Sequence, residues 1–269
     1  MTDNDNFEAC ALLNEVKQIA LDAGRHILEI YETDFAVEHK DDKSPLTAAD
    51  MASHKTIVAG LQRLTPEIPI LSEESASIPF AERRTWNRYW LIDPLDGTRE
   101  FIKRNGEFTV NIALIHDRRA ELGVVHVPVT GMSYFACAGG GAFKQPAGQA
   151  AEAIHVRKLP DGPVIVAGSR SHSGDSLLRF LDNLGAHELV SMGSALKICL
   201  VADGTADIYP RLGLTSEWDT AAAQCVVEAA GGKVTGLDMQ PLLYNTKDSL
   251  LNPHFFVFGD ATRNWSTYL

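Results

Sequence analysis

The 269-residue sequence has few cysteines and no long apolar run. Its four cysteines lie far apart, and no Cys-x-x-Cys pair or His/Cys cluster occurs, which argues against a zinc site or a disulfide framework. No stretch approaches the roughly 18 apolar residues that a membrane-spanning helix needs, and the N-terminal residues lack the basic flank and apolar run of a signal peptide. We therefore expect reduced core cysteines at Cys10, Cys137, Cys199 and Cys225 in a cytoplasmic protein, with at most peripheral association with the inner membrane.

Basic residues are also scarce relative to acidic ones. The chain has 24 Lys and Arg against 35 Asp and Glu, a net charge of −11. Because polyphosphate partners require a cationic surface, this balance argues against a nucleic-acid polymer as partner. A small phosphorylated substrate remains compatible if bound metal ions reverse the local field. The length corresponds to about two domains, and no feature of the sequence indicates an oligomeric state.

Apolar residues at helical spacing predict two long helices near the N-terminus, one over 7–31 and one that follows Thr47 and ends near residue 64. A short strand is expected between them at 35–38. Asp50 stands three residues after Thr47, in the pattern of a capping box, so helix capping is the plainest interpretation of Asp50.

The remainder of the chain divides into two patterns. An antiparallel meander is expected over 108–137, with a hairpin at 139–141, and 148–151 is a linker candidate. After it, strands and helices alternate to the last expected strand at 254–258, with one helix expected over 216–230. The change of pattern at this linker candidate indicates two parts, 1–150 and 151–269.

One stretch is poorly explained by folding alone: residues 90–99, with the sequence WLIDPLDGTR. The apolar residues predict a buried strand, and Pro94 is expected to end its ladder. Asp93 and Asp96 would then lie on one tight turn. Gly97 permits close approach of a ligand, and Thr98 begins a helix whose free N–H groups favour an anion. The alternative is a strand-turn-helix corner in which Asp96 or Thr98 is only an N-cap.

The acids become informative as a set, because Glu73, Asp93, Asp96 and Asp219 each stand at the end of a predicted strand or the start of a helix. Oxygen ligands without His or Cys suit a hard cation such as Mg²⁺. Asp93 is placed to bridge two ions. Two such ions can orient and ionise a water while they stabilise charge on a phosphoryl group, which is the chemistry of phosphate ester hydrolysis.

Three segments, in this order and at these separations, resemble the signatures of the inositol monophosphatase superfamily of Mg-dependent, lithium-sensitive phosphatases. They are residues 72–75 (SEES), 90–98 (WLIDPLDGT) and 217–222 (EWDTAA). Three further segments are most similar to the bacterial 3′(2′),5′-bisphosphate nucleotidase branch, which serves sulfur metabolism. They are residues 43–50 (KSPLTAAD), 168–172 (GSRSH) and 244–253 (YNTKDSLLNP). The resemblance covers nearly the whole chain and implies a layered αβαβα sandwich of mixed α/β class. It also implies an α+β half at 1–150 that carries most metal ligands and an α/β half at 151–269 that contributes Asp219 and substrate contacts.

The resemblance also implies roles for individual residues. The metal ligands for two or three Mg²⁺ would be Glu73, Asp93, the carbonyl of Leu95, Asp96 and Asp219. Catalysis would use Thr98 with Asp50 or Glu73 to activate the attacking water. The substrate contacts would be Glu73, Leu95, Asp96, Gly97, Thr98, Arg170, His172, Ser194, Lys197 and Asp219. For Lys197 the alternative is a solvated helix position, and for His172 a plain loop residue; Glu217 stands where a sugar or base contact could lie.

The implied reaction is hydrolysis of the 3′-phosphate of adenosine 3′,5′-bisphosphate, which yields AMP and phosphate without a covalent enzyme intermediate. Two other functions remain open from the residues. An inositol or sugar monophosphatase would use the same catalytic corner. A non-catalytic nucleotide sensor is a third candidate, although a sensor would not need to keep the complete ligand set together with Thr98.

Overall fold

The computed structural model describes residues 9–33, 45–169 and 174–269. The strand expected at 35–38 and the site candidates Arg170 and His172 lie outside these ranges. A search of the described helices finds none with the length and apolarity required to cross a bilayer.

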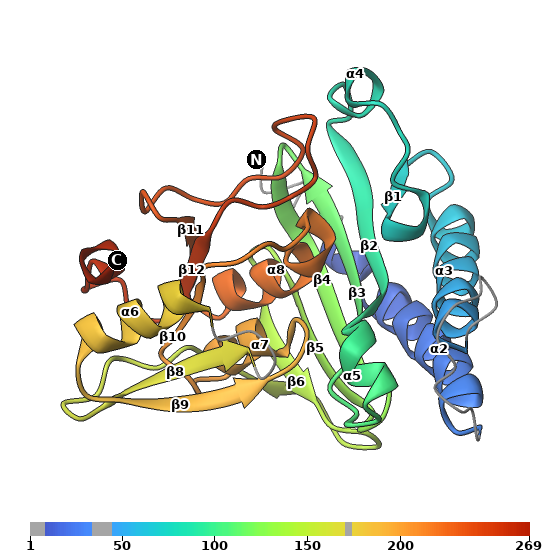
Figure 1. The fold of residues 1–269 in the computed structure, drawn as a ribbon. Helices are drawn as coiled ribbons and strands as arrows, with labels where there is room; N and C mark the ends of the chain where they lie inside the picture. The colour runs from blue at the N-terminus through green and yellow to red at the C-terminus, as the bar shows by residue number, and fades with distance from the viewer. Residues whose placement is uncertain (1–8, 34–44, 170–173) are drawn as a thin grey trace.

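Two sheets form the framework of the molecule (Figure 1). The first follows chain order and is antiparallel except for the parallel pair β1 and β2. Its strands are β1 (Ile70–Ser72), β2 (Arg88–Asp96), β3 (Thr109–His116), β4 (Arg119–Val127), β5 (Met132–Cys137), β6 (Gly141–Gln145) and β7 (Glu152–Ala153). The second sheet has the order β11-β12-β10-β8-β9. Its strands are β8 (Val164–Ser169), β9 (His187–Met192), β10 (Ile208–Arg211), β11 (Lys233–Gly236) and β12 (Phe255–Phe258).

Helices cover the outer face of each sheet and fill the space between the two sheets (Figure 1). The helices are α2 (Leu13–Tyr31), α3 (Pro45–Leu64), α4 (Phe80–Arg83), α5 (Thr98–Ile102), α6 (Asp175–Leu184), α7 (Leu196–Ala202) and α8 (Ala221–Ala229), with 3₁₀ turns η1 (Glu73–Ser75), η2 (Glu217–Asp219) and η3 (Trp265–Tyr268). In order across the molecule, α2 and α3 are followed by the seven-stranded sheet, α7 and α8, the five-stranded sheet, and α6 with η3. The predicted αβαβα sandwich is confirmed.

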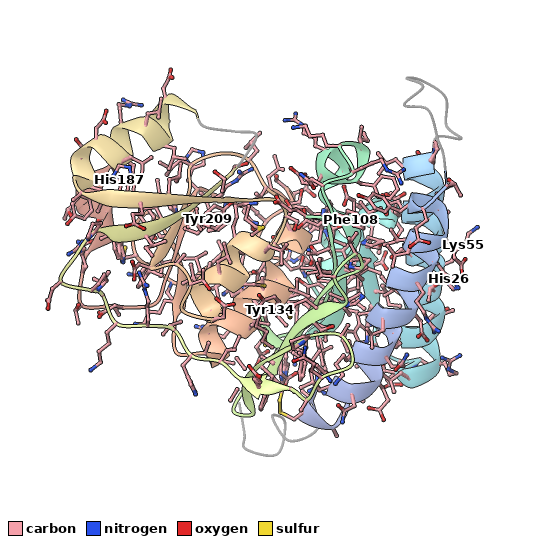
Figure 2. All side chains as sticks on the ribbon, turned by 90° about the horizontal axis from the view of Figure 1, so that it is seen from below. His26, Lys55, Phe108, Tyr134, His187 and Tyr209 are labelled. Atoms are coloured by element: carbon pink, nitrogen blue, oxygen red, sulfur yellow. A yellow bond between two sulfur atoms is a disulfide. The ribbon has the colours of Figure 1, made fainter. Side chains whose placement is uncertain are left out.

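Alternation of side chains along the strands explains why the layers hold together. Consecutive residues of a strand point to opposite faces, and both faces of the first sheet are covered. Trp90 and Ile92 therefore pack in the core beneath α2 and α3, whereas Leu91 packs in the central core against α7 and α8. A third core lies between the second sheet and α6. Figure 2 shows Phe108 in the layers near α2 and Tyr209 in the five-stranded sheet.

Three local predictions need correction. Helix α3 is already helical at Pro45, so Asp50 lies within the helix and the capping-box interpretation is wrong. The single helix expected over 216–230 is divided into η2 and α8. Pro94 was expected to end its strand, but β2 continues through Pro94 to Asp96, because a β-bulge accommodates the proline.

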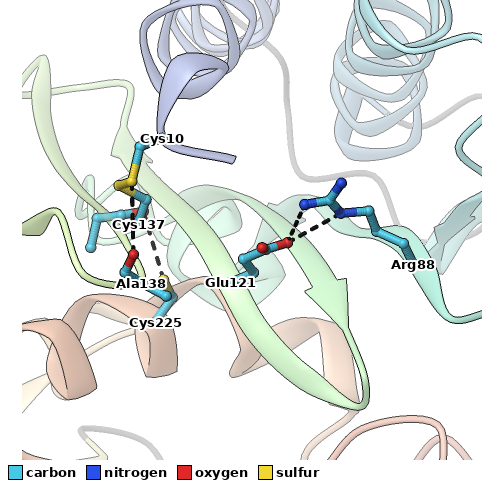
Figure 3. Close-up of a disulfide and its surroundings, with 7 residues drawn as sticks. Cys10, Arg88, Glu121, Cys137, Ala138 and Cys225 are labelled. Carbon is cyan, nitrogen blue, oxygen red and sulfur yellow. Dashed lines mark hydrogen bonds and ion pairs between the residues drawn. A yellow bond between two sulfur atoms is a disulfide. The ribbon is translucent and has the colours of Figure 1, made fainter. Parts of the chain in front are cut away.

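The expectation that all four cysteines are reduced is wrong for one pair. A disulfide joins Cys10, in the helical turn at 9–11, to Cys137 at the end of β5 (Figure 3). Their Cα atoms lie 5.3 Å apart although 127 residues separate them in sequence. Cys199 and Cys225 are free and buried, as expected. The pairing depends on how the N-terminal segment packs on the sheet, so the spacing of the cysteines does not reveal it.

Close packing of the central layer makes Gly123 a sensitive position. A Cβ added to Gly123 of β4 would lie 2.2 Å from the carbonyl oxygen of Ala222 in α8. We expect Gly123→Ala to lower the free energy of unfolding by about 2–3 kcal/mol, because helix and strand must separate. Gly162→Ala is the matched control, since no heavy atom lies within 4 Å of that added Cβ. Urea denaturation of both variants measures the difference, and equal stabilities would contradict the packing described.

The buried imidazole of His126 should make stability depend on acid pH. Its Nδ1 lies 3.0 Å from Ser133 Oγ, its ring contacts Gly24 of α2, and burial lowers the pKa of His126 to about 4. Because the unfolded chain binds this proton near pH 6.5, stability is present above that pH and is lost as the pH falls towards 4. We expect this group to remove about 2 kcal/mol between pH 7 and pH 5. Denaturation at saturating Mg²⁺ should show a smaller loss in His126→Gln; identical losses would exclude His126 as the cause.

Candidate metal centre and active site

Three carboxylates meet between the two sheets. Asp93 and Asp96 come from the end of β2, and Asp219 comes from η2, which packs against β2. One carboxylate oxygen from each of the three lies within 4.8 Å of the others. The structure thus brings together side chains that the sequence separates widely, and all three were predicted ligands.

The bulge in β2 sets the spacing of Asp93 and Asp96. Asp93 pairs with Asn111 of β3 and Asp96 with Thr109, so the three-residue step in β2 is matched by a two-residue step in β3. The backbone N–H of Leu95 donates to Asp93 Oδ1 at 3.0 Å, and the Leu95 side chain is buried. The apolar side chain of Leu95 therefore belongs to the core, as it must if only its carbonyl serves the site.

Asp96 is held by hydrogen bonds from both halves of the chain. Its Oδ2 accepts from the N–H of Ala195 at 2.6 Å, from Asn111 Nδ2 at 3.3 Å and from Thr109 Oγ1 at 3.4 Å. Ala195 follows Ser194, which has a φ of 45°, in the turn after β9. A Cβ at Gly193 would lie 2.8 Å from the carbonyl oxygen of Glu107, so this close approach requires glycine.

Asp219 is fixed by its own 3₁₀ turn. The side chain of Ser216 and that of Asp219 form a capping box, in which the N–H of Ser216 donates to Asp219 Oδ2 at 2.9 Å. This capping role leaves the other carboxylate oxygen available for a ligand.

Glu73 and Asp50 extend the acidic cluster on the side of α3 and η1. Partial desolvation and the neighbouring charge of Asp96 raise the pKa of Glu73, which also hydrogen-bonds Asp93. Burial and the adjacent Glu74 raise the pKa of Asp50 to about 8. Asp50 Oδ1 is buried and has no hydrogen-bond partner among the described residues.

Converging carboxylates raise one another's pKa values throughout the cluster. Burial, and then the charges of Asp96 and Glu73, raise the pKa of Asp93 well above its usual range, and burial with the Asp96 charge raises the pKa of Asp219 to about 7. A divalent cation would remove this repulsion. Among the described residues the donors are oxygen atoms only, and Asp50 Oδ1, which has no partner among those residues, is a further acceptor, so the cluster fits a hard cation such as Mg²⁺.

Gly97 and Thr98 follow the carboxylates directly. Gly97 has a φ of 99° and is the N-cap residue of α5, which begins at Thr98. The N-cap position is thus occupied by Gly97, so the interpretation of Asp96 or Thr98 as only an N-cap is wrong. The Thr98 side chain is exposed beside the cluster, and α5 packs against α3, the helix that carries Asp50.

A cleft of about 140 Å³ opens beside the carboxylates. Asp96, Gly97, Ser194, Lys197 and Asp219 line it, which brings five predicted substrate contacts together. The cleft is also lined by residues that sequence reasoning had assigned no role, since no local pattern marks them: Arg99, Glu100, Tyr209, Arg211 and Thr215.

Lys197 is not the solvated helix residue that one interpretation allowed. It is 6% exposed, and its Nζ donates to the carbonyl of Ser194 at 2.6 Å and to that of Met192 at 3.4 Å. Burial lowers its pKa to about 8, against the opposing effect of Asp96. Glu217 was expected near a sugar or base, but its buried carboxylate accepts from the N–H of Asn245 at 2.9 Å and does not line the cleft.

The layered αβαβα fold and the cluster of carboxylates between its sheets define the class of protein: a phosphatase built as a layered sandwich. A model of the inositol monophosphatase family matches residues 9–263, and the chain belongs to that family. The chain is 49% identical over 248 residues to the 3′(2′),5′-bisphosphate nucleotidase CysQ of Salmonella typhimurium, an alignment that covers 91% of this chain and 99% of the relative. The CysQ of Escherichia coli strain K12 is 48% identical over the same shares.

Solved structures agree with this assignment. The crystal structure of CysQ from Bacteroides thetaiotaomicron, described as a bacterial member of the inositol monophosphatase family, superposes with a TM-score of 0.82 at 40% identity and covers 95% of this chain and 97% of that one. An inositol monophosphatase from Zymomonas mobilis shares the fold, with a TM-score of 0.77 at 24% identity, and covers 95% and 96% of the two chains.

Proposed function

We propose that this protein is a Mg²⁺-dependent phosphatase that hydrolyses the 3′-phosphate of adenosine 3′,5′-bisphosphate to AMP and phosphate. The observation that carries the proposal is the oxygen-only cluster of Asp93, Asp96 and Asp219 beside a cleft. The nucleotidase activity in the names of relatives up to 49% identical supports the choice of substrate. By the same resemblance the enzyme would act in cytoplasmic sulfur metabolism and be inhibited by Li⁺.

The metal ligands in this proposal are Glu73, Asp93, the carbonyl of Leu95, Asp96 and Asp219. They would hold two or three Mg²⁺ ions, with Asp93 shared between two. Bound there, the ions would polarise the attacking water and offset negative charge on the phosphoryl oxygens and the leaving oxygen. Asp50 Oδ1 is buried and has no hydrogen-bond partner in the part of the chain that the structure describes, which supports a further ion or an ordered water on the side of α3.

The chain's own groups would take up the proton of the attacking water. Thr98, with Asp50 or Glu73, would take a proton from the water that attacks the 3′-phosphorus in line. The new oxygen–phosphorus bond forms as the bond to the ribose 3′-oxygen breaks, and that oxygen leaves with a proton from solvent. The N–H of Gly97 and the hydroxyl of Thr98 would hold the phosphoryl oxygens.

The rest of the substrate would occupy the cleft between the halves 1–150 and 151–269, which we retain as the proposed domains. Ser194 and Lys197 line this cleft from the second half, and Arg211 adds a cationic side chain there. Cationic groups are required wherever a second phosphate binds. Arg170 and His172 stay proposed contacts for that phosphate.

Phosphate release from a small substrate panel tests the proposal. We expect release from adenosine 3′,5′-bisphosphate to exceed release from inositol 1-phosphate, to require Mg²⁺ and to fall when Li⁺ is added. A preference for inositol 1-phosphate would identify a sugar monophosphatase instead. Nucleotide binding without any phosphate release at saturating Mg²⁺ would identify a sensor.

A further inference from the structure

A buried arginine outside the cleft connects the two sides of the carboxylate cluster. Arg83, the last residue of α4, is 1% exposed and stacks on the ring of Phe80 with its guanidinium carbon 4.8 Å from the ring centroid. One guanidinium nitrogen donates to Asn245 Oδ1 at 2.7 Å and to the carbonyl of Lys247 at 3.2 Å. The other terminal nitrogen of the guanidinium donates to the carbonyl of Asp248. A guanidinium is suited to donate several hydrogen bonds at once because its N–H groups are fixed in one plane.

Asn245 hydrogen-bonds both Arg83 and Glu217. Its Nδ2 donates to the carbonyl of Arg83 at 2.5 Å, and its backbone N–H donates to Glu217 Oε2 at 2.9 Å. Glu217 is the first residue of η2 and lies two residues before Asp219. The buried carboxylate of Glu217 is thus held by the segment 244–252, which Arg83 binds.

The far end of the same segment also holds η2. Asn252 Nδ2 donates to the carbonyl of Ser216 at 2.7 Å and approaches Thr220 Oγ1 at 3.1 Å. Ser216 is the capping partner of Asp219. Segment 244–252 therefore hydrogen-bonds residues on both sides of Asp219.

Arg83 also lies on the chain just before β2, the strand that carries Asp93 and Asp96. A bond from Arg83 to segment 244–252 therefore ties the start of β2 to η2. Arg83 does not line the cleft, and its guanidinium is bound by segment 244–252 instead.

We propose that Arg83 is a positioning residue that sets Asp219 against Asp93 and Asp96 through Asn245 and Glu217, so that the three carboxylates are arranged for Mg²⁺. This rests on the proposed metal-dependent function. Arg83→Lys keeps the charge but loses the planar set of donors. Asn245→Gly removes the side chain and keeps the left-handed backbone of that residue, whose φ is 53°.

Titration calorimetry with Mg²⁺ alone is the test. We expect Arg83→Lys and Asn245→Gly each to raise the Kd for Mg²⁺ about tenfold, which corresponds to about 1.4 kcal/mol. Because they break one connection, the double variant should be no weaker than either single variant. At saturating Mg²⁺, kcat should return to within about threefold of the unsubstituted protein, as expected for misplacement rather than loss of a ligand.

Arg157→Lys is the matched control. Arg157 makes a bidentate pair with the buried Asp207, both bonds at 2.7 Å, and lines no part of the cleft. The Arg157→Lys variant should have a lower Tm than the unsubstituted protein and a Kd for Mg²⁺ within about twofold of it. If Arg83→Lys and Asn245→Gly behave like this control, the positioning role is refuted; should Arg83→Lys fail to fold, Asn245→Gly decides alone. An unsubstituted protein that binds no Mg²⁺ would instead refute the proposed function.

Discussion

Asp96→Asn is expected to lower kcat by roughly 10³-fold or more, because several kcal/mol of metal-derived stabilisation would be lost. Asn retains one oxygen, which can still accept from the N–H of Ala195 at the position where Asp96 Oδ2 does so at 2.6 Å. Its amide nitrogen then faces Asp93 and Asp219, and an amide nitrogen donates hydrogen bonds and does not ligate Mg²⁺. Steady-state phosphate release at saturating Mg²⁺ measures the loss.

The fold should survive this substitution. With one carboxylate fewer, repulsion within the cluster falls, so Tm without Mg²⁺ should be equal to or above that of the unsubstituted protein. Asp203→Asn is the control: it removes a carboxylate that pairs with Lys144 at 2.7 Å, outside the cleft, and should lower Tm but not kcat. Turnover retained by Asp96→Asn would remove Asp96 from the metal site.

Mg²⁺ should stabilise the protein far more than monovalent salt does. Binding at 100 times the Kd adds about 2.7 kcal/mol, which for a chain of this size raises Tm by roughly 5–8 °C. NaCl at equal ionic strength only screens the cluster, and screening is weak between buried charges. Thermal unfolding in EDTA, in NaCl and in Mg²⁺ makes the comparison. Equal shifts in NaCl and Mg²⁺ would contradict a specific site.

The pH dependence of that shift follows from the raised pKa values. Burial and the charge of Asp96 raise the pKa of Asp219 from 3.8 to about 7, so its contribution to stability is complete below about pH 4 and is lost as the pH rises through 7. Without metal, Tm should therefore fall between pH 6 and pH 8. Because Mg²⁺ binds the deprotonated form, the increase in Tm that Mg²⁺ produces should be larger at pH 8 than at pH 6.

Local sequence predicts those features whose chemistry is local. The strand that ends in Asp93 and Asp96 has a continuous apolar pattern, and helical and strand periods predict the order of the elements, whereas the layered sandwich was implied by the family resemblance. Asp219 could be named as a candidate because it completes an oxygen-only set of acids and because the family resemblance implies a ligand role for it, although no local pattern encodes its convergence with β2. The local pattern was wrong at Asp50, because Thr47 and Asp50 match a capping box although the helix begins before them.

Residues whose roles depend on packing between distant segments were not predictable. Lys197 reads as an exposed helical lysine, but the turn after β9 surrounds it with carbonyl groups. Arg83 lies in an ordinary charged stretch, and only the fold brings Asn245 to it. Cys10 and Cys137 are separated by 127 residues and meet only when the first helical turn packs on β5. Such contacts are set by tertiary structure, which propensity and spacing do not specify.

Product analysis of a single reaction tests the central claim most directly. Adenosine 3′,5′-bisphosphate is incubated with the protein and Mg²⁺, and the products are identified by phosphorus NMR. We predict adenosine 5′-phosphate and inorganic phosphate, and no product in EDTA or with Asp96→Asn. Adenosine 3′-phosphate as the product, or turnover that persists in the chelator, would contradict a carboxylate-bound metal acting on the 3′-phosphate.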